Sequence, residues 1–178
     1  TKDENGWTAY MQACGNGHKD VIQLLLDHSE RIELNARNNN GGTAFMWACY
    51  NGHKDVVQLL LDNSERIELN ARTNVGWTAF MLSCGKGHKD VVQLLLGHSD
   101  KEIDLNARDN YGWTALMLAC SKGHKDVVKL LIDHSGCTNI DLNARSNMGF
   151  TAFLLACKEG HKDVVQLLLH YSKRIDLN

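Results

Sequence analysis

Cysteine and histidine recur four residues apart along this chain of 178 residues. The pairs are Cys14/His18, Cys49/His53, Cys84/His88, Cys120/His124 and Cys157/His161. Thiolate and imidazole are natural zinc ligands, so each pair could form half of a tetrahedral site. The alternative is a small buried cysteine and a turn histidine on either side of a glycine that ends a helix. We expect the alternative and no metal, because no second pair in the same stretch completes four ligands.

The sequence gives little indication of phosphate binding or catalysis. The segment Gly85-Lys86-Gly87-His88-Lys89 has glycines and lysines, but it lacks the spacing of a phosphate-binding loop and a preceding strand. No Ser-His-Asp set and no pair of carboxylates stands out. The sequence therefore predicts that the protein is not an enzyme and needs no cofactor.

The dipeptide Gly-His marks an internal repeat. It recurs at steps of 35, 35, 36 and 37 residues, preceded each time by Gly-x-Thr-Ala and followed by Lys-Asp-Val and a leucine-rich run. The extra residues of the two longer steps fall just before Ile103 and Ile140, which predicts a loop there. Cys137 falls in the second insertion, and we expect it to be exposed in that loop.

Each unit predicts two short helices and an extended segment. Thr43 is a candidate N-cap for a first helix that Gly52 ends. A second helix is expected to open at Lys54-Asp55, a charged pair that should be solvated in every unit. Apolar and polar residues then alternate from Ile67 to Asn70, as in an extended segment. Two such helices cannot bury their own apolar faces, but stacked copies can, which predicts a solenoid.

These segments, in this order, resemble the ankyrin repeat from about Asp3 to Asn178. The resemblance implies an all-α ankyrin-repeat solenoid of stacked helix–turn–helix units with extended finger loops. The five repeats would span residues 3–37, 38–72, 73–108, 109–145 and 146–178.

The chain departs from the family pattern at two places. Thr-Ala replaces the usual Thr-Pro, and the histidine two residues later is replaced in every copy, which removes a source of hydrogen bonds between repeats. Apolar packing should substitute for it, through Met11, Met46, Met81, Met117 and Leu154. The turn after the second helix is longer, so that helix should end without a glycine cap, as at 64–67.

The resemblance implies that the protein binds another protein or a peptide, through the finger tips and the concave face of the first helices. Positions there differ between copies while the scaffold positions barely change. The resulting candidate residues are Trp7, Tyr50, Val75, Trp77, Lys86, Tyr111, Trp113, Lys122, Met148 and Phe150. The tryptophan row could instead pack against the fingers. We expect Trp47 to pack, compensating for Gly42, and the asparagines Asn35, Asn70, Asn106 and Asn143 to be structural.

Charge and composition limit the classes of partner that the protein could bind. The 19 basic and 21 acidic residues give a formal net charge of −2, which argues against a nucleic-acid binder or a polybasic membrane segment. No run approaches 18 apolar residues, and unpaired cysteines suggest a reducing, cytoplasmic setting.

The terminal units are as apolar as the interior ones, for example at Val21 and Leu24 in the first and Val165 and Leu168 in the fifth. We therefore expect a piece of a longer array that could self-associate end to end. The rival to partner recognition is a structural spacer without a dedicated ligand.

Overall fold

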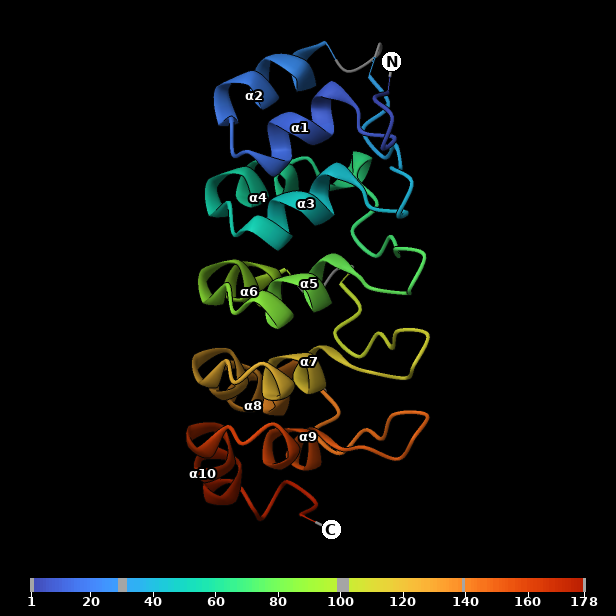
Figure 1. Ribbon diagram of the computed structural model, residues 1–178. Coiled ribbons are helices and arrows are strands. Elements are labelled where there is room, and N and C mark those ends of the chain that lie inside the picture. The colour runs from blue at the N-terminus through green and yellow to red at the C-terminus, as the bar shows by residue number, and fades with distance from the viewer. Residues whose placement is uncertain (1, 29–31, 99–102, 139, 178) are drawn as a thin grey trace.

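The computed structural model describes residues 2–28, 32–98, 103–138 and 140–177. Over this part the chain forms ten α-helices in five consecutive pairs, stacked from the N-terminus to the C-terminus (Figure 1). The first helices are α1 (Ala9–Gly15), α3 (Ala44–Asn51), α5 (Ala79–Lys86), α7 (Ala115–Ser121) and α9 (Ala152–Lys158). The second helices are α2 (Lys19–Asp27), α4 (Lys54–Leu61), α6 (Lys89–Gly97), α8 (Lys125–Thr138) and α10 (Lys162–His170).

Each first helix begins where the sequence predicted. The hydroxyls of the preceding threonines accept a hydrogen bond from the backbone N–H three residues on, so Thr43 caps α3 and Thr78 caps α5. The same helices end at Gly52 (φ 75°) and Gly87 (φ 76°), a left-handed conformation that glycine adopts without strain.

The core lies within each helix pair and between neighbouring pairs. The two helices of a pair pack on each other, each first helix packs on the next first helix, and each second helix packs on the next second helix. In α4, Val56, Val57, Leu60 and Leu61 are buried while Lys54 and Asp55 are exposed. The lysine–aspartate pair is exposed in all five units, as predicted.

The segments between pairs form fingers that project to one side of the stack (Figure 1). Ile67 and Leu69 are buried and Glu68 is exposed, so the predicted alternation is confirmed. The turn before them is a short 3-10 helix, Ser64–Arg66. The only bridge of strand type among the described residues is the isolated pair Lys2 and Thr8, and the fold is all-α.

The substituted histidine position behaves as predicted in four of the five repeats. Met11, Met46, Met81 and Met117 are buried, with at most 1% of each side chain exposed. Leu154 departs from the prediction, because its side chain is 38% exposed. Among the described residues, no further first helix packs on α9 as α9 packs on α7.

One row of hydrogen bonds between repeats comes from the histidine of the Gly-His dipeptide. In each case the ring Nε2 donates over 2.8–3.0 Å to a carbonyl oxygen at the end of the first helix of the preceding repeat. The histidines are His53, His88, His124 and His161. The preceding repeat leaves room for the ring, because a Cβ on Gly87 would lie 2.6 Å from Nδ1 of His124. The same close approach holds for Gly17, Gly52 and Gly123. The turn histidine is therefore a structural contact between repeats.

Four of the five cysteines of the Cys/His pairs are buried inside the stack, as expected, and the fifth, Cys157 in the last repeat, is not. Cys14, Cys49, Cys84 and Cys120 are buried free thiols, and burial raises the pKa of each, that of Cys14 to about 12. Cys157 is a free thiol and exposed. Within the described ranges, no group of three or more His, Cys, Asp or Glu residues could hold a metal ion.

The loop expected before Ile103 falls on residues 99–102, which lie outside the described residues. The loop expected before Ile140 was predicted wrongly. Helix α8 continues to Thr138, and within it the Ser135 hydroxyl donates to the carbonyl of Ile132 over 2.6 Å. The inserted residues therefore extend the helix, and Cys137 falls in its last turn. The side chain of Cys137 lies outside the described residues.

Candidate functional site

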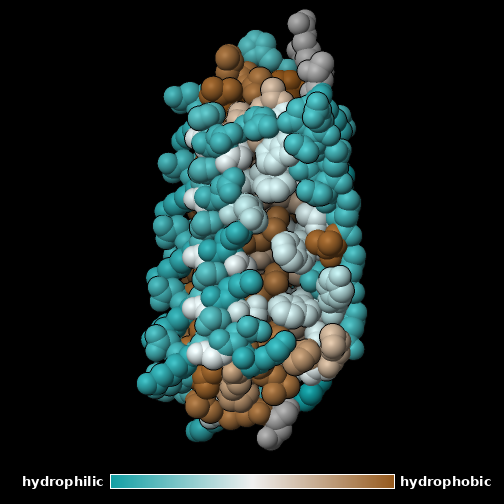
Figure 2. Space-filling model, viewed as in Figure 1, coloured by the Kyte–Doolittle hydropathy of each residue, from teal (hydrophilic) through white to brown (hydrophobic). Residues whose placement is uncertain are grey.

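The face between the first helices and the fingers carries three adjoining hollows that all share Trp77. The central hollow has a volume of about 520 Å³ and lies between α3, α5 and α7. Its neighbours have volumes of about 300 and 340 Å³ and extend toward the fingers that carry Val75 and Tyr111. Figure 2 views this face, where apolar side chains show between the helices and the fingers. We call the three hollows together the Trp77 groove.

Trp77 is held in place by the next repeat. Its indole Nε1 donates to Oδ2 of Asp109 over 3.0 Å. The other oxygen of Asp109 accepts from the backbone N–H groups of Tyr111 (2.9 Å) and Trp113 (2.8 Å), which shapes the finger turn. Asp109 is only 8% exposed, and these three hydrogen bonds compensate the burial of its carboxylate. Trp77 therefore both packs against the stack and lines the groove.

The floor of the central hollow is open because α5 carries a glycine there. A Cβ built on Gly85 would meet only Leu118, at 3.5 Å, which is an ordinary contact. The equivalent position holds Tyr50 in α3 and Ser121 in α7. The hollow over Gly85 is lined mainly by Trp77, Met81, Leu82 and Leu118.

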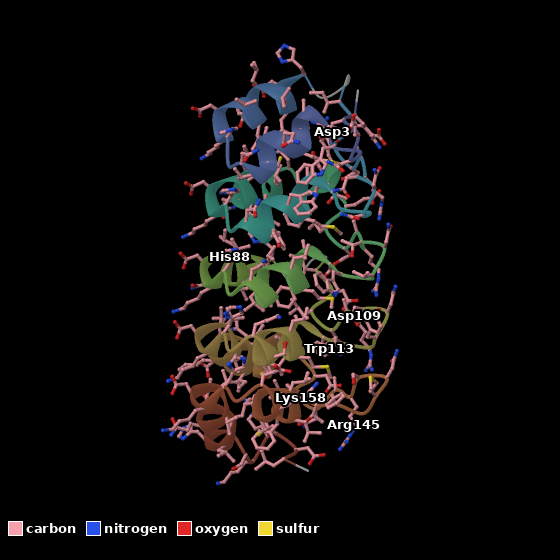
Figure 3. All side chains as sticks on the ribbon, viewed as in Figure 1. Asp3, His88, Asp109, Trp113, Arg145 and Lys158 are labelled. Carbon is pink, nitrogen blue, oxygen red and sulfur yellow. The ribbon has the colours of Figure 1, made fainter. Side chains whose placement is uncertain are left out.

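Lysines stand at the end of the first helices on the edge of this hollow. Lys86 and Lys122 are both exposed and both line it. Nζ of Lys86 lies 4.3 Å from the ring centre of Tyr50, within the range of a cation–π interaction. Lys158 also lies at the end of its helix, α9, but one position earlier in the repeat than Lys86 and Lys122, whose equivalent in the fifth repeat is Glu159. Figure 3 labels Lys158 together with Asp109 and Trp113.

An aromatic cluster adjoins the groove at its N-terminal end. The ring centres of Trp7 and Trp47 are 4.5 Å apart, and those of Trp47 and Tyr50 are 5.4 Å apart. A Cβ on Gly42 would lie 2.8 Å from Nε1 of Trp47, so the Trp47 ring fills the space beside this glycine. Trp47 packs, as predicted.

The structure brings most of the predicted binding residues together and leaves three apart. Those that line the groove are Tyr50, Val75, Trp77, Lys86, Tyr111, Trp113 and Lys122. Trp7 stacks on Trp47 instead. Met148, 82% exposed, lies in the last finger, and Phe150 lies under Lys158, whose Nζ is 5.3 Å from its ring centre.

Sequence reasoning missed Gly85, Asp109 and a row of asparagines that join the fingers. The side-chain amide of each of these asparagines donates to a carbonyl of the preceding finger over 2.9–3.1 Å. They are Asn39, Asn74, Asn110 and Asn147, each two residues before a turn glycine, and that spacing was the available signal.

The asparagines that were predicted to be structural also connect repeats. Oδ1 of Asn35 accepts from the N–H of Glu68 over 2.9 Å, and Asn70, Asn106 and Asn143 make the same contact one repeat on. Together these two rows of asparagines hold each finger against its neighbour by hydrogen bonds. The wall that the fingers give to the groove is therefore ordered without a bound partner.

The comparisons with known proteins agree with this architecture. A family model described as ankyrin repeats (3 copies) matches residues 1–73, 65–145 and 99–178, which together span the chain. A search of curated proteins finds no match. In the part of the chain that the structure describes, no helix is long and apolar enough to cross a membrane.

Proposed function

Because the chain belongs to the ankyrin-repeat family, whose members generally act as protein-interaction modules, we propose that it recognises a peptide or protein surface in the Trp77 groove and at the neighbouring finger tips. One observation carries the proposal. Three hollows meet at Trp77 and are lined by side chains that differ from repeat to repeat, on a scaffold whose buried positions repeat almost unchanged. Stacking alone does not demand those differences.

The groove suits binding more than chemistry. Its central hollow is lined mainly by apolar side chains, and the buried carboxylate at its side, Asp109, is already engaged in hydrogen bonds. A preformed concave surface with a few polar groups is typical of binding sites. The ankyrin family is also typically non-catalytic, and we propose recognition without reaction.

Filling the groove from its floor tests the proposal. Gly85→Leu adds a side chain into the central hollow, while Gly97→Leu, at the end of α6, meets nothing within 4 Å of its Cβ and serves as the matched control. Both variants replace a helical glycine and should be slightly more stable than the wild type, by about 0.5–1 kcal/mol.

The assay is selection of displayed random twelve-residue peptides on the immobilised protein. We expect peptides that bind the wild type and Gly97→Leu and lose binding to Gly85→Leu. If every enriched peptide binds Gly85→Leu as well as the wild type, or none is enriched, the spacer interpretation replaces recognition.

End-to-end self-association is a second proposal, supported by apolar side chains exposed at both ends of the stack. Val21 and Leu24 of α2 are 49% and 60% exposed, and Leu154 and Leu169 at the other end are 38% and 47% exposed. Figure 2 shows apolar side chains at the top and bottom of the molecule. The faces resemble the surfaces that neighbouring repeats bury against each other.

A further inference from the structure

We infer that the groove takes an acidic partner, an extended peptide in which one bulky apolar side chain is flanked by carboxylates. The inference rests on the proposed function and specifies the chemistry of the ligand. It follows from the central hollow, whose walls are apolar and whose edge is cationic.

The apolar anchor is expected over Gly85. The hollow there is bounded by Trp77, Leu82 and Leu118, and its volume of about 520 Å³ lies within the usual range for ligand sites. A large apolar side chain that fills such a pocket removes apolar surface on both partners from water. A small polar side chain would leave the pocket unfilled.

The edge of the same hollow is positively charged. Lys86 and Lys122 line it, and no carboxylate does. In the neighbouring hollow toward Tyr111, Asp109 is buried with both oxygens in hydrogen bonds, and Glu159 lies 3.9 Å from Nζ of Lys158. The unopposed charges beside the hollow over Gly85 are therefore cationic, and a carboxylate complements them.

The positive charge at the groove edge is also confined to the third and fourth repeats. The position of Lys86 and Lys122 holds Asn16 in the first repeat and Asn51 in the second, next to the aromatic cluster, and Glu159 in the fifth. The carboxylates of the peptide should accordingly lie over the third and fourth repeats and its neutral part over the first two.

A peptide fits these features better than a nucleic acid does. Nucleic-acid affinity grows with the number of phosphates that basic groups neutralise, and only two lysines line the central hollow. Its walls also include the aliphatic side chains of Met81, Leu82 and Leu118, which suit an apolar anchor. A single-stranded oligonucleotide is therefore the competitor to include in the test.

The test uses the peptides selected on the wild type and two charge-reversed proteins. Lys86→Glu/Lys122→Glu alters the groove edge. Lys89→Glu/Lys125→Glu makes the same change of charge at the exposed starts of α6 and α8, away from the groove lining, and is the matched control. Binding of fluorescein-labelled peptides is measured by anisotropy at 50 and 300 mM salt, with a ten-nucleotide oligothymidylate as competitor.

We expect the groove-dependent peptides to carry Asp or Glu on at least one side of an aromatic or leucine residue. Their affinity should fall at least tenfold in the groove variant, less than twofold in the control variant, and further at high salt. Neutral or basic peptides that are sensitive to Gly85→Leu but not to Lys86→Glu/Lys122→Glu would overturn the inference and leave the proposed function standing. Tighter binding of the oligonucleotide than of any peptide would overturn it in favour of nucleic acid. The absence of any peptide sensitive to Gly85→Leu would remove both.

Discussion

Replacing Gly87 by alanine tests the contact between glycine and histidine that joins successive repeats. Gly87 has φ 76°, and a Cβ there would lie 2.6 Å from Nδ1 of His124, whose Nε2 donates to the Gly85 carbonyl over 3.0 Å. Gly160 is the matched position, because it has φ 73° and nothing lies within 4 Å of its added Cβ.

The two substitutions share the backbone strain and differ in the displaced ring. An alanine in the left-handed region costs about 1–2 kcal/mol, which is all that we expect for Gly160→Ala. Gly87→Ala must also move the His124 ring, and losing that hydrogen bond adds about 0.5–1.5 kcal/mol. With the disturbed packing around the ring we expect a total of about 2–4 kcal/mol.

Urea unfolding followed by circular dichroism measures both effects as free energies of unfolding. Because Gly160 lies in the last repeat, the comparison is repeated in the His124→Ala background, where no ring remains to be displaced. There Gly87→Ala should cost only as much as Gly160→Ala. The reasoning is refuted if Gly87→Ala costs the same with and without the His124 ring.

Three further outcomes follow from the structure. Iodoacetamide at pH 8 should alkylate exposed Cys157 well before the buried thiols, as measured by peptide mapping with mass spectrometry, and unfolding in urea should remove the difference in rate. Equal rates in the folded protein would contradict the burial of Cys14, Cys49, Cys84 and Cys120. Hydrogen bonds from Lys129 and Tyr171 lower the pKa of Asp133, so its contribution to stability is present above the ordinary carboxyl pKa and is lost as pH falls through the lowered value. Asp133→Asn should therefore flatten the dependence of the urea midpoint on pH in the acid range, and an unchanged profile would argue against the lowered pKa. Sedimentation velocity should show a weight-average mass that rises with concentration in the wild type and less in Leu24→Lys, whereas a monomer at all concentrations would exclude end-to-end association.

Local and periodic features of the fold could be predicted from the sequence. The cap at Thr43, the helix stop at Gly52 and the alternation at Ile67–Leu69 depend on residues within a few positions of each other, and each is confirmed. The prediction of a loop around Cys137 was wrong, because an insertion can lengthen a helix as readily as a turn. The length of the insertion does not distinguish a longer helix from a longer turn.

The site was predicted in part, for a physical reason. Tyr50, Trp77 and Lys122 were identified because they vary between copies at positions that face one side. Asp109 was missed because its hydrogen bond to Trp77 crosses 32 residues and one repeat boundary. Gly85 was not recognised as the floor of the hollow, since the absence of a side chain matters only once Leu118 and Trp77 are seen around it.

The contact of glycine with histidine has a consequence for how this protein can change over evolutionary time. Every junction between described repeats uses the same two positions, a glycine of one copy and the histidine of the next, as in Gly17 with His53 and Gly52 with His88. Deleting residues 18–52, one whole unit, would join Gly17 directly to His53 and place Gly17 in the position that Gly52 now holds opposite His88, which recreates the junction. Gain or loss of DNA in whole units of about 35 codons therefore preserves the joint, whereas a gain of half a unit breaks it. Recombination can thus lengthen or shorten the groove, or replace the repeat that carries Lys86, while the contacts between stacked repeats stay the same.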